Sequence, residues 1–247
     1  MSTARRPRHQ DRQRFTWRDN TFRIGPLAGD PHVAQMTPDP RATPPLTAGV
    51  RACLDALIEM GYRAVITAAL RPTEVAAFTA AGFEPREELV VLLHDLTRIP
   101  PPLFRTRRPR HRERPKVVAI DHAAFEPAWW MSSAGIDDAR DATPTNRHRV
   151  IDADVLGEGD DLAGYSIIGR SGAVGYLQRV AVDPSLEGRG IGRSLVTDGL
   201  LWLRRRGART AIVNTQRVNA RALALYEALG FTADPLATLT VLSRELP

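Results

Sequence analysis

The sequence contains one strand–helix–strand pattern twice, and this repeat constrains the fold more than any other feature. Gly-Tyr-Arg-Ala-Val-Ile-Thr at residues 61–67 parallels Gly-Ala-Arg-Thr-Ala-Ile-Val at residues 207–213. Phe-Thr-Ala-Ala-Gly-Phe at residues 78–83 parallels Tyr-Glu-Ala-Leu-Gly-Phe at residues 226–231, and a mostly apolar segment follows each copy. Because a repeated supersecondary unit folds into a repeated structure, we predict two related α/β halves.

Composition shifts divide the chain into four parts. Residues 1–20 are polar and rich in arginine, which predicts a disordered basic tail, and residues 21–96 form the first half. Residues 97–116 contain three consecutive prolines and many arginines, which predicts an extended linker. Residues 117–247 form the second half. Hydrophobic periodicity there predicts helices over residues 117–125, 137–141, 191–206 and 220–229 and strands over residues 149–155, 164–169, 175–183, 210–215 and 236–242.

Charge and cysteine content exclude several classes of function. The net charge is +6 and the pI is about 10.3, but much of the basic excess lies in the tail and the linker. A nucleic-acid or ribosome contact through the tail is therefore the minor interpretation. The single cysteine, Cys53, excludes an internal disulfide, and the six histidines lack the spacing of metal ligands. Without a long apolar run or a secretory signal, we expect a cytoplasmic protein that uses no membrane and no metal.

A glycine-rich turn connects the predicted strand 175–183 to the predicted helix 191–206. Its sequence at residues 187–194 is Glu-Gly-Arg-Gly-Ile-Gly-Arg-Ser. Glycines at alternate positions allow several backbone N–H groups to converge at a helix N-terminus, which favours a phosphate group. The turn lacks the lysine of a P-loop and the G-x-G-x-x-G spacing of a dinucleotide fingerprint. A turn that binds no ligand is the alternative.

The surroundings of this turn resemble the GNAT superfamily of acyl-CoA-dependent N-acetyltransferases. The resemblance rests on Val-Asp-Pro at residues 182–184, the turn itself, and Asn-Ala-Arg-Ala-Leu-Ala-Leu-Tyr-Glu-Ala-Leu-Gly-Phe at residues 219–231. The spacing is similar to that of protein N-terminal-alanine acetyltransferases, and the duplicated plan resembles mycothiol synthase and other tandem GNAT proteins. The implied fold class is α/β (α+β), with a mixed central sheet flanked by helices and a degenerate GNAT-like N-terminal half.

The resemblance also implies a set of site residues. Tyr226 would donate a proton to the leaving CoA thiolate, and Asn219 would contact the cofactor. The strand residues would pair with the pantetheine arm of acetyl-CoA, and the turn residues would hold its pyrophosphate. These two groups are Val180, Ala181 and Val182, followed by Gly188, Arg189, Gly190, Ile191, Gly192 and Arg193.

The first copy departs from the second where the turn should be. Residues 42–49 read Ala-Thr-Pro-Pro-Leu-Thr-Ala-Gly, and Pro44 and Pro45 remove N–H donors that an anion site needs. Phe78 stands at the position equivalent to Tyr226 and has no hydroxyl group. We therefore expect the first half to act as a scaffold.

The second half also departs from the family pattern. Asn214 stands where alanine-type protein acetyltransferases carry a glutamate base, so the base stays open; Asn214 or Gln178 would instead order a water molecule. Glu187 replaces a usual Gln or Arg, and we expect its carboxylate to point to solvent.

The acceptor side offers weaker candidates. Asp121 and Glu126 would bind a cationic amine, or they are ordinary exposed carboxylates. Trp129, Trp130 and Met131 line the acceptor site or belong to the core, with equal weight. Cys53 lies far from the turn in sequence, which argues against a covalent cysteine intermediate.

These observations predict an enzyme that transfers an acetyl group from acetyl-CoA to a primary amine of a small molecule or a protein N-terminus. The amine would attack directly, and Tyr226 would serve as general acid. The alternative is a non-catalytic acyl-CoA-binding or scaffold protein, which the absence of the glutamate at Asn214 favours.

Overall fold

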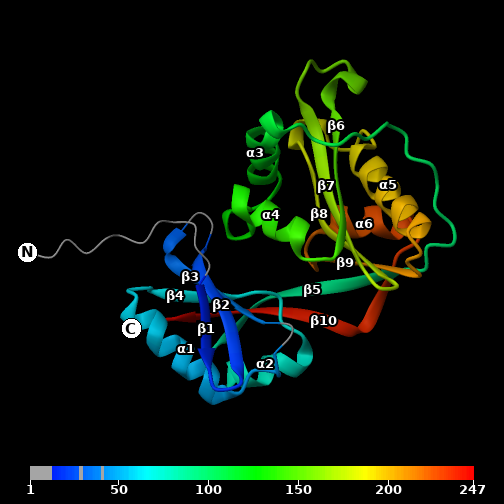
Figure 1. Cartoon of the computed structure of the whole chain (residues 1–247). Coiled ribbons are helices and arrows are strands. Elements are labelled where there is room, and N and C mark those ends of the chain that lie inside the picture. Colours follow the sequence, from blue (N-terminus) through cyan, green and yellow to red (C-terminus); the bar gives the residue numbers. More distant parts are fainter. Residues whose placement is uncertain (1–12, 28–29, 40–41) are drawn as a thin grey trace, which may run out of the picture. The chain divides into compact units, whose positions relative to one another are not determined.

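The structure is a computed structural model that describes residues 13–27, 30–39 and 42–247, and it contains two compact units (Figure 1). Unit 1 comprises the described residues up to Leu89 together with Ala237–Pro247, and unit 2 comprises Val90–Leu236. These units differ from the sequence-based ranges 21–96 and 117–247 at both ends. The linker falls inside unit 2, and the last eleven residues fall inside unit 1.

Unit 1 is a mixed sheet with two helices. Its strands run in the order β1-β2-β3-β4-β10, with β3 parallel to β4 and the other neighbours antiparallel. A core that includes Phe22, Met36 and Leu57 holds the sheet and helices together. The elements are β1 (Gln13–Trp17), β2 (Asn20–Leu27), β3 (Asp30–Pro38), α1 (Thr47–Glu59), β4 (Ala64–Thr67), α2 (Pro72–Thr79), β5 (Glu84–His94) and β10 (Thr232–Glu245), of which β5 and β10 also contribute to unit 2.

The prediction of a disordered tail over residues 1–20 was wrong for residues 13–20. Phe15 and Trp17 alternate with polar residues in β1, and β1 pairs with β2 through a two-residue turn in which Arg18 has a φ of 50°. This is the geometry of a tight hairpin. The charged residues of this segment hid the period-two pattern in the sequence. Residues 1–12 lie outside the described residues.

In unit 2, the strands run in the order β5-β9-β8-β7-β6. Helices α3 and α4 cover one face of β7 and β8, and α5 covers the other (Figure 1). The predicted strands and helices of the second half are confirmed, with shifted ends. The sequence did not predict the short 3-10 helices η1–η4, and η3 takes the place of the end of the strand predicted over residues 149–155. The elements are η1 (His111–Glu113), α3 (Arg114–Ala124), η2 (Pro127–Trp129), α4 (Ser133–Asp141), β6 (Thr145–Asp152), η3 (Ala153–Leu156), β7 (Leu162–Ser171), β8 (Val174–Val182), η4 (Pro184–Leu186), α5 (Ile191–Arg205), β9 (Thr210–Gln216) and α6 (Ala220–Ala228).

The two halves of the sequence exchange their closing strands. In unit 1, β10 pairs with β4 in the register Ser243↔Ile66, and Leu242 is fully buried in the core of that unit. In unit 2, β5 lies beside β9, and Leu92 is buried in the core around α5. Each half therefore completes the sheet of the other, which is the topology of a strand swap within one chain.

The repeat predicted from the sequence extends to the backbone. Gly82 and Gly230 both follow a helix with positive φ, of 85° and 89°. The N–H of Phe83 donates to the carbonyl of Phe78 (3.1 Å), and the N–H of Phe231 donates to the carbonyl of Tyr226 (3.0 Å). This is the six-to-one bond that closes a helix through a left-handed residue. The two helix ends are built alike.

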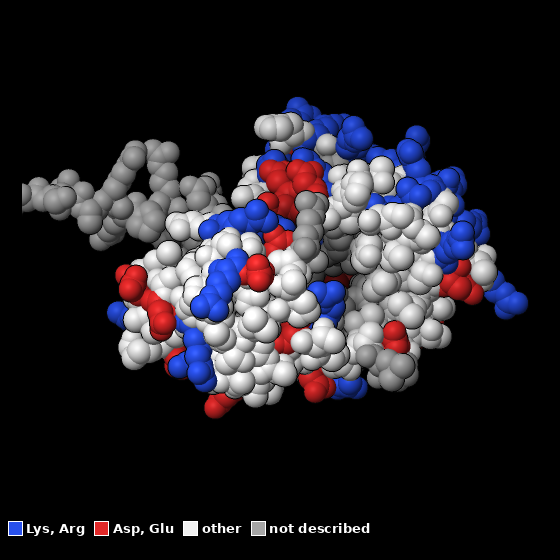
Figure 2. Space-filling view, turned by 60° about the horizontal axis from the view of Figure 1, so that its bottom comes forward, with Lys and Arg blue, Asp and Glu red and all other residues white. Residues whose placement is uncertain are grey.

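Basic side chains gather on part of the surface, along the upper and right edge of the view in Figure 2. Exposed arginines of unit 2 include Arg98, Arg105 and Arg112 of the segment before α3 and Arg204–Arg206 at the end of α5. Within the described ranges, no helix has the length and apolar character that crossing a membrane requires.

Candidate active site

The glycine-rich turn adopts the backbone that its sequence predicts. Gly188 has a φ of 74° and Gly190 a φ of 86°, both in the left-handed region that favours glycine. Asp183 starts the turn, because its Oδ1 accepts the N–H of Ser185 (2.9 Å) and the Oγ–H of Ser185 (2.6 Å). The chain then enters α5 at Ile191 without a side chain that caps the helix.

The N-terminus of α5 has free donors. The first intrahelical bond runs from the N–H of Ser194 to the carbonyl of Gly190 (3.0 Å), so the N–H groups of residues 191–193 have no intrahelical acceptor. The Nε of Arg193 is buried and has no hydrogen-bond partner in the described part of the chain. These donors and the helix dipole favour an anion, so the residues present fit the diphosphate of an acyl-CoA.

Strands β8 and β9 separate beside this turn. Their parallel register runs only from Val174↔Thr210 to Tyr176↔Ile212, although β8 continues to Val182 and β9 to Gln216. The N–H of Asp183 donates to the carbonyl of Ala163 on β7 (2.9 Å), so the backbone N–H and C=O groups of Asp183 and Ala181 face β7. By alternation, Val180 and Val182 direct their N–H and C=O groups to the open side. An extended ligand can add there as a strand.

Helix α6 packs against the first turn of α5. A Cβ at Gly192 would lie 3.3 Å from Leu225 Cδ2 on α6 and 3.6 Å from Val182 Cγ2 on β8, so a larger residue crowds both elements. Asn219 caps α6, since its Oδ1 accepts the N–H of Ala222 (3.0 Å). This capping bond is a structural task that the sequence did not assign to Asn219.

Tyr226 lies on α6, one residue after Leu225, and its side chain is 7% exposed. Its ring lies 5.4 Å from that of Phe231. Burial raises the pKa of Tyr226 to about 12, so the hydroxyl keeps its proton across the neutral range. A protonated hydroxyl is what a general acid needs.

Three predicted charged or amide side chains lie on the surface. Asn214 and Glu126 are exposed. Arg189 forms an ion pair with Glu158, with 2.5 Å between its terminal nitrogen and Oε1. The prediction for Glu187 needs a correction, because its carboxylate pairs with Arg221 on α6 and does not point freely to solvent.

Asp121 is buried, so it is neither an exposed carboxylate nor a residue that can bind a cationic amine, the two roles that the sequence suggested. Its side chain is 0% exposed and accepts hydrogen bonds from Arg179 Nε (2.7 Å), from a terminal nitrogen of Arg179 (2.9 Å), from Tyr165 Oη (2.5 Å) and from the N–H of Met131 (2.7 Å). All its acceptor positions are occupied. Asp121 therefore cannot bind a cationic substrate amine or accept its proton.

The Asp121–Arg179 pair fixes the loop between α3 and α4. Arg179 also donates to the carbonyl of Trp129 (2.6 Å), and its guanidinium carbon lies 3.5 Å from the centroid of the Phe125 ring. Trp130 stacks on His122, with ring centroids 4.4 Å apart. The aromatic residues of this loop are half-buried, so they contribute to packing and keep an accessible surface.

A β-bulge lies at Gln178. Ile167 pairs with Arg179 and Ile168 with Leu177, so Gln178 is the additional residue. A Cβ at Gly169 would lie 2.6 Å from Gln178 Oε1, which shows how closely that side chain approaches the neighbouring strand. Its Oε1 is buried and has no hydrogen-bond partner among the described residues. Bulges bend a strand away from its neighbour, and this one lies where β8 and β9 separate.

The equivalent turn of unit 1 is closed by an internal side chain. Asn20 is 2% exposed, and its Oδ1 accepts the N–H of Leu46, the residue that precedes α1 (2.9 Å). A Cβ at Gly49 would lie 2.2 Å from the same Oδ1, so Asn20 fills the space at this helix N-terminus. Pro44 and Pro45 offer no N–H group. Cys53 is fully buried in the same unit, and burial raises the pKa of its thiol to about 12.

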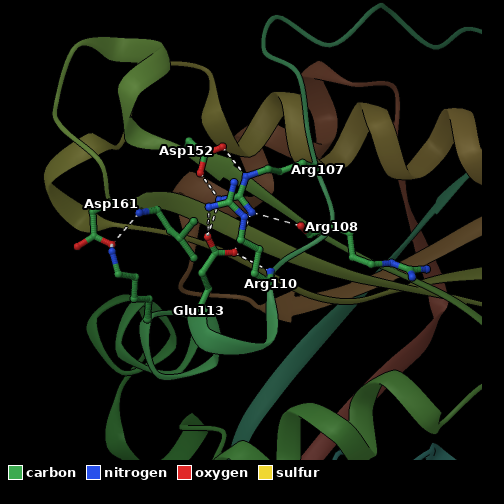
Figure 3. Close-up of polar contacts among 8 residues, drawn as sticks. Arg107, Arg108, Arg110, Glu113, Asp152 and Asp161 are labelled. Carbon is green, nitrogen blue, oxygen red and sulfur yellow. Dashed lines mark hydrogen bonds and ion pairs between the residues drawn. The ribbon is translucent and has the colours of Figure 1, made fainter.

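The segment predicted as a linker is an integrated part of unit 2. We call residues 97–110 the strap. Arg107 forms a two-way backbone pair with Val150 of β6 (3.0 and 2.9 Å), and its guanidinium bonds Asp152 (2.6 Å from Nε) and Glu113 (2.8 Å twice), as Figure 3 shows. Arg107 holds the pKa of Glu113 at about 2. The arginines of this segment are thus not all free for a polyanion.

Sequence analysis missed the roles of Arg179, Ser194 and the strap. One signal was available for Arg179, which is the only charged residue over residues 175–182 of the strand that the sequence predicts over residues 175–183. A charge among buried positions requires a buried partner. No local signal indicated Ser194, because its partners lie about ninety positions earlier in the chain.

A glycine turn with N–H donors, two separating strands and a buried tyrosine together form the candidate site. Comparison with known proteins gives a family match for the part of the chain that holds this site. Residues 113–231 match the Acetyltransferase (GNAT) family. This part of the chain is thus similar to the GNAT acetyltransferases.

Curated relatives are similar to parts of this chain. A mycothiol acetyltransferase of Amycolatopsis mediterranei (strain U-32) is 32% identical over 171 residues, which cover 61% of this chain and 56% of that protein. A mycothiol acetyltransferase of Thermomonospora curvata is 46% identical over 59 residues, covering 24% of this chain and 20% of that protein. The matched part thus spans about half the length of the first relative and a fifth of the second.

Solved structures show the fold over almost the whole chain. A tandem GNAT protein from the clavulanic acid biosynthesis pathway has a TM-score of 0.66 at 15% identity and covers 92% of this chain and 78% of its own. A GCN5-related N-acetyltransferase from Kribbella flavida has a TM-score of 0.63 at 14% identity and covers 96% and 90%. The duplicated α/β plan predicted from the sequence is confirmed by the first of these.

Proposed function

We propose that unit 2 transfers the acetyl group of acetyl-CoA to a primary amine by direct attack, with Tyr226 as general acid. The observation that carries this proposal is the junction at Gly192. There the open edge of β8, the donor-rich start of α5 and the helix that holds Tyr226 lie against one another. These are the three groups that acyl transfer from a CoA thioester requires.

The chain's own residues provide binding and proton transfer. Acetyl-CoA, when bound, supplies an activated thioester. Backbone N–H groups of residues 188–193 and Arg193 would hold the diphosphate, and the open edge at Val180–Val182 would hold the pantetheine arm. The Tyr226 hydroxyl holds a proton for the departing thiolate. Because Asn214 and Gln178 are amides, neither accepts the proton of the amine. A water molecule that these side chains order would accept it instead.

The acceptor is proposed by chemical class. The relatives named mycothiol acetyltransferase make an amine precursor of that thiol the first compound to test. The alternative acceptor to test is a peptide N-terminus, which the spacing of the turn suggested. Incubation of the purified chain with acetyl-CoA and panels of small amines and peptides, followed by detection of free CoA thiol, tests the proposal. Release of thiol that depends on the amine supports it.

A second candidate function is acyl-CoA binding without catalysis. The exposed amide of Asn214 favours it, because no carboxylate replaces the expected base. Calorimetry separates the two candidates. Tight CoA binding without turnover on any amine would favour this second function, whereas turnover that Tyr226→Phe lowers would exclude it.

A further inference from the structure

Ser194 connects the strap to the first turn of α5. Its side chain is fully buried, and its Oγ accepts the N–H groups of Leu103 and Phe104, each at 3.1 Å. The same Oγ donates to the carbonyl of Gly190 (3.0 Å). The hydroxyl therefore uses its one donor and both acceptor positions. One side chain links the strap to the glycine on which the phosphate turn depends.

The strap also contacts the turn directly. A Cβ at Gly190 would lie 2.7 Å from Leu103 Cδ1 and 3.7 Å from Phe104 Cε2. Phe104 packs against the cluster that contains Ile191 and Leu195 of α5, whereas Leu103 is 62% exposed. The strap thus lies along the start of α5, beside the N–H donors.

Both ends of the strap are anchored within unit 2. At one end, Arg204 at the end of α5 donates to the carbonyl of Thr97 (3.3 Å). At the other end, Arg107 pairs with Val150 and with the carboxylates of Asp152 and Glu113 (Figure 3). The matched family region begins only at residue 113, so the strap lies outside it.

We propose that the strap is a positioning element of the phosphate turn and that it acts through Ser194. The inference rests on the proposed function, because the ligand of the turn is taken to be CoA. Ser194 and Leu103 hold Gly190 in its left-handed conformation, so the N–H groups of residues 191–193 converge before the ligand arrives. A preorganised site loses less conformational freedom on binding.

Coupling of this kind is reciprocal. If the attached strap favours CoA binding, bound CoA must favour the attached strap by the same factor. The N–H groups of Leu103 and Phe104 report this directly, because they exchange with solvent only when they leave Ser194 Oγ. We expect saturating CoA to slow their hydrogen exchange in the wild-type chain.

The variants are Ser194→Ala and Leu103→Ala, with Thr197→Val as control. Thr197 is also fully buried on α5, and its hydroxyl donates to the carbonyl of Arg193 (2.9 Å), but its Oγ does not bond the strap. Leu103→Ala changes an exposed side chain, so folding is preserved if Ser194→Ala proves unstable. Calorimetry with CoA, below the unfolding transition of each variant, gives the dissociation constants.

We expect Ser194→Ala to weaken CoA binding about tenfold, which corresponds to the loss of one or two ordinary hydrogen bonds. Leu103→Ala should weaken it by a smaller factor, and Thr197→Val should leave it unchanged. Equal affinities in Ser194→Ala and Thr197→Val, or CoA binding that leaves the Leu103 and Phe104 exchange rates unchanged, overturn this inference alone. Failure of the wild-type chain to bind CoA overturns it together with the proposed function.

Discussion

Arg179 and Asp121 form a buried bidentate ion pair, with Nε to Oδ2 at 2.7 Å and a terminal nitrogen to Oδ1 at 2.9 Å. The pair connects β8, on which the open edge lies, to α3 and to the loop at Trp129. Replacing one partner leaves the other charge buried without compensation.

Asp121→Asn should therefore lower the free energy of unfolding by about 3–5 kcal/mol. Asp137→Asn is the control, because Asp137 pairs with Arg114 where both side chains are about a third exposed, and such pairs contribute about 0–1 kcal/mol. Urea unfolding followed by circular dichroism measures both. Equal decreases in the free energy of unfolding of the two variants would show that the buried pair contributes no more to stability than the exposed pair.

Tyr226→Phe should lower turnover while acetyl-CoA affinity stays the same. General acid catalysis contributes roughly 10²–10⁴-fold, and we expect the lower end, because a thiolate leaves without full protonation. The loss should shrink at low pH, where solvent supplies the proton. Since the pKa of Tyr226 is about 12, wild-type turnover should show no titration of this group between pH 6 and 9.

Turnover against pH for Tyr226→Phe, for wild type and for Tyr62→Phe in unit 1 as control measures this effect. A Tyr226→Phe variant as fast as wild type at every pH would assign Tyr226 to the core, where Phe78 lies in the first copy.

Each chain should bind one CoA. In unit 1, Asn20 Oδ1 already accepts the N–H before α1, and two prolines remove others. In unit 2, Gly192→Val should abolish binding, since its Cβ would lie only 3.3 Å from Leu225 Cδ2 and its methyl groups would crowd the first turn of α5. Calorimetry gives the stoichiometry. A value of two, or unchanged affinity in Gly192→Val, would contradict the assignment of the single site to the α5 turn.

Because the closing strands are exchanged, a core substitution in one of them should destabilise the unit built mainly from the other half of the sequence. Leu242→Ala should weaken unit 1 and Leu92→Ala should weaken unit 2, each by about 2–5 kcal/mol, the usual cost of removing a buried leucine side chain. Native-state hydrogen exchange resolves the effect, with β2 and β3 reporting on unit 1 and β7 and β8 on unit 2. The opposite pattern would mean that each closing strand stays with its own half.

Stability should fall below pH 6.5 through His148. Burial, with smaller effects of Arg140 and Arg114, lowers the pKa of His148 to about 4. An unfolded histidine titrates near pH 6.5, so between pH 6.5 and 4 the unfolded state binds more protons and the free energy of unfolding decreases as pH falls. The full contribution is about 3 kcal/mol at 1.36 kcal/mol per pKa unit.

The His148→Phe variant removes this titration. Its free energy of unfolding should decline less than that of wild type between pH 7 and pH 4.5 in urea titrations. Parallel declines in the two proteins would show that His148 does not contribute.

Local pattern was sufficient to predict much of unit 2. The helix predicted over residues 191–206 is α5 (Ile191–Arg205), because its apolar spacing and the glycine after it depend only on near neighbours. The positive φ of Gly188 and Gly190 likewise follows from the turn itself. The sequence alone therefore determined the glycine turn, its helix and the repeated helix ends.

Long-range partners decided the rest. The two closing strands have similar apolar patterns, so sequence could not show that β10 pairs with β4 and that β5 lies beside β9. The sequence predicted Asp121 as a surface carboxylate, but in the structure Arg179 lies against it. It predicted residues 97–110 as a linker, but Ser194 accepts two of their N–H groups. The free energy of a buried ion pair or a strand pairing depends on groups far apart in the chain. Only the tertiary structure brings those groups together.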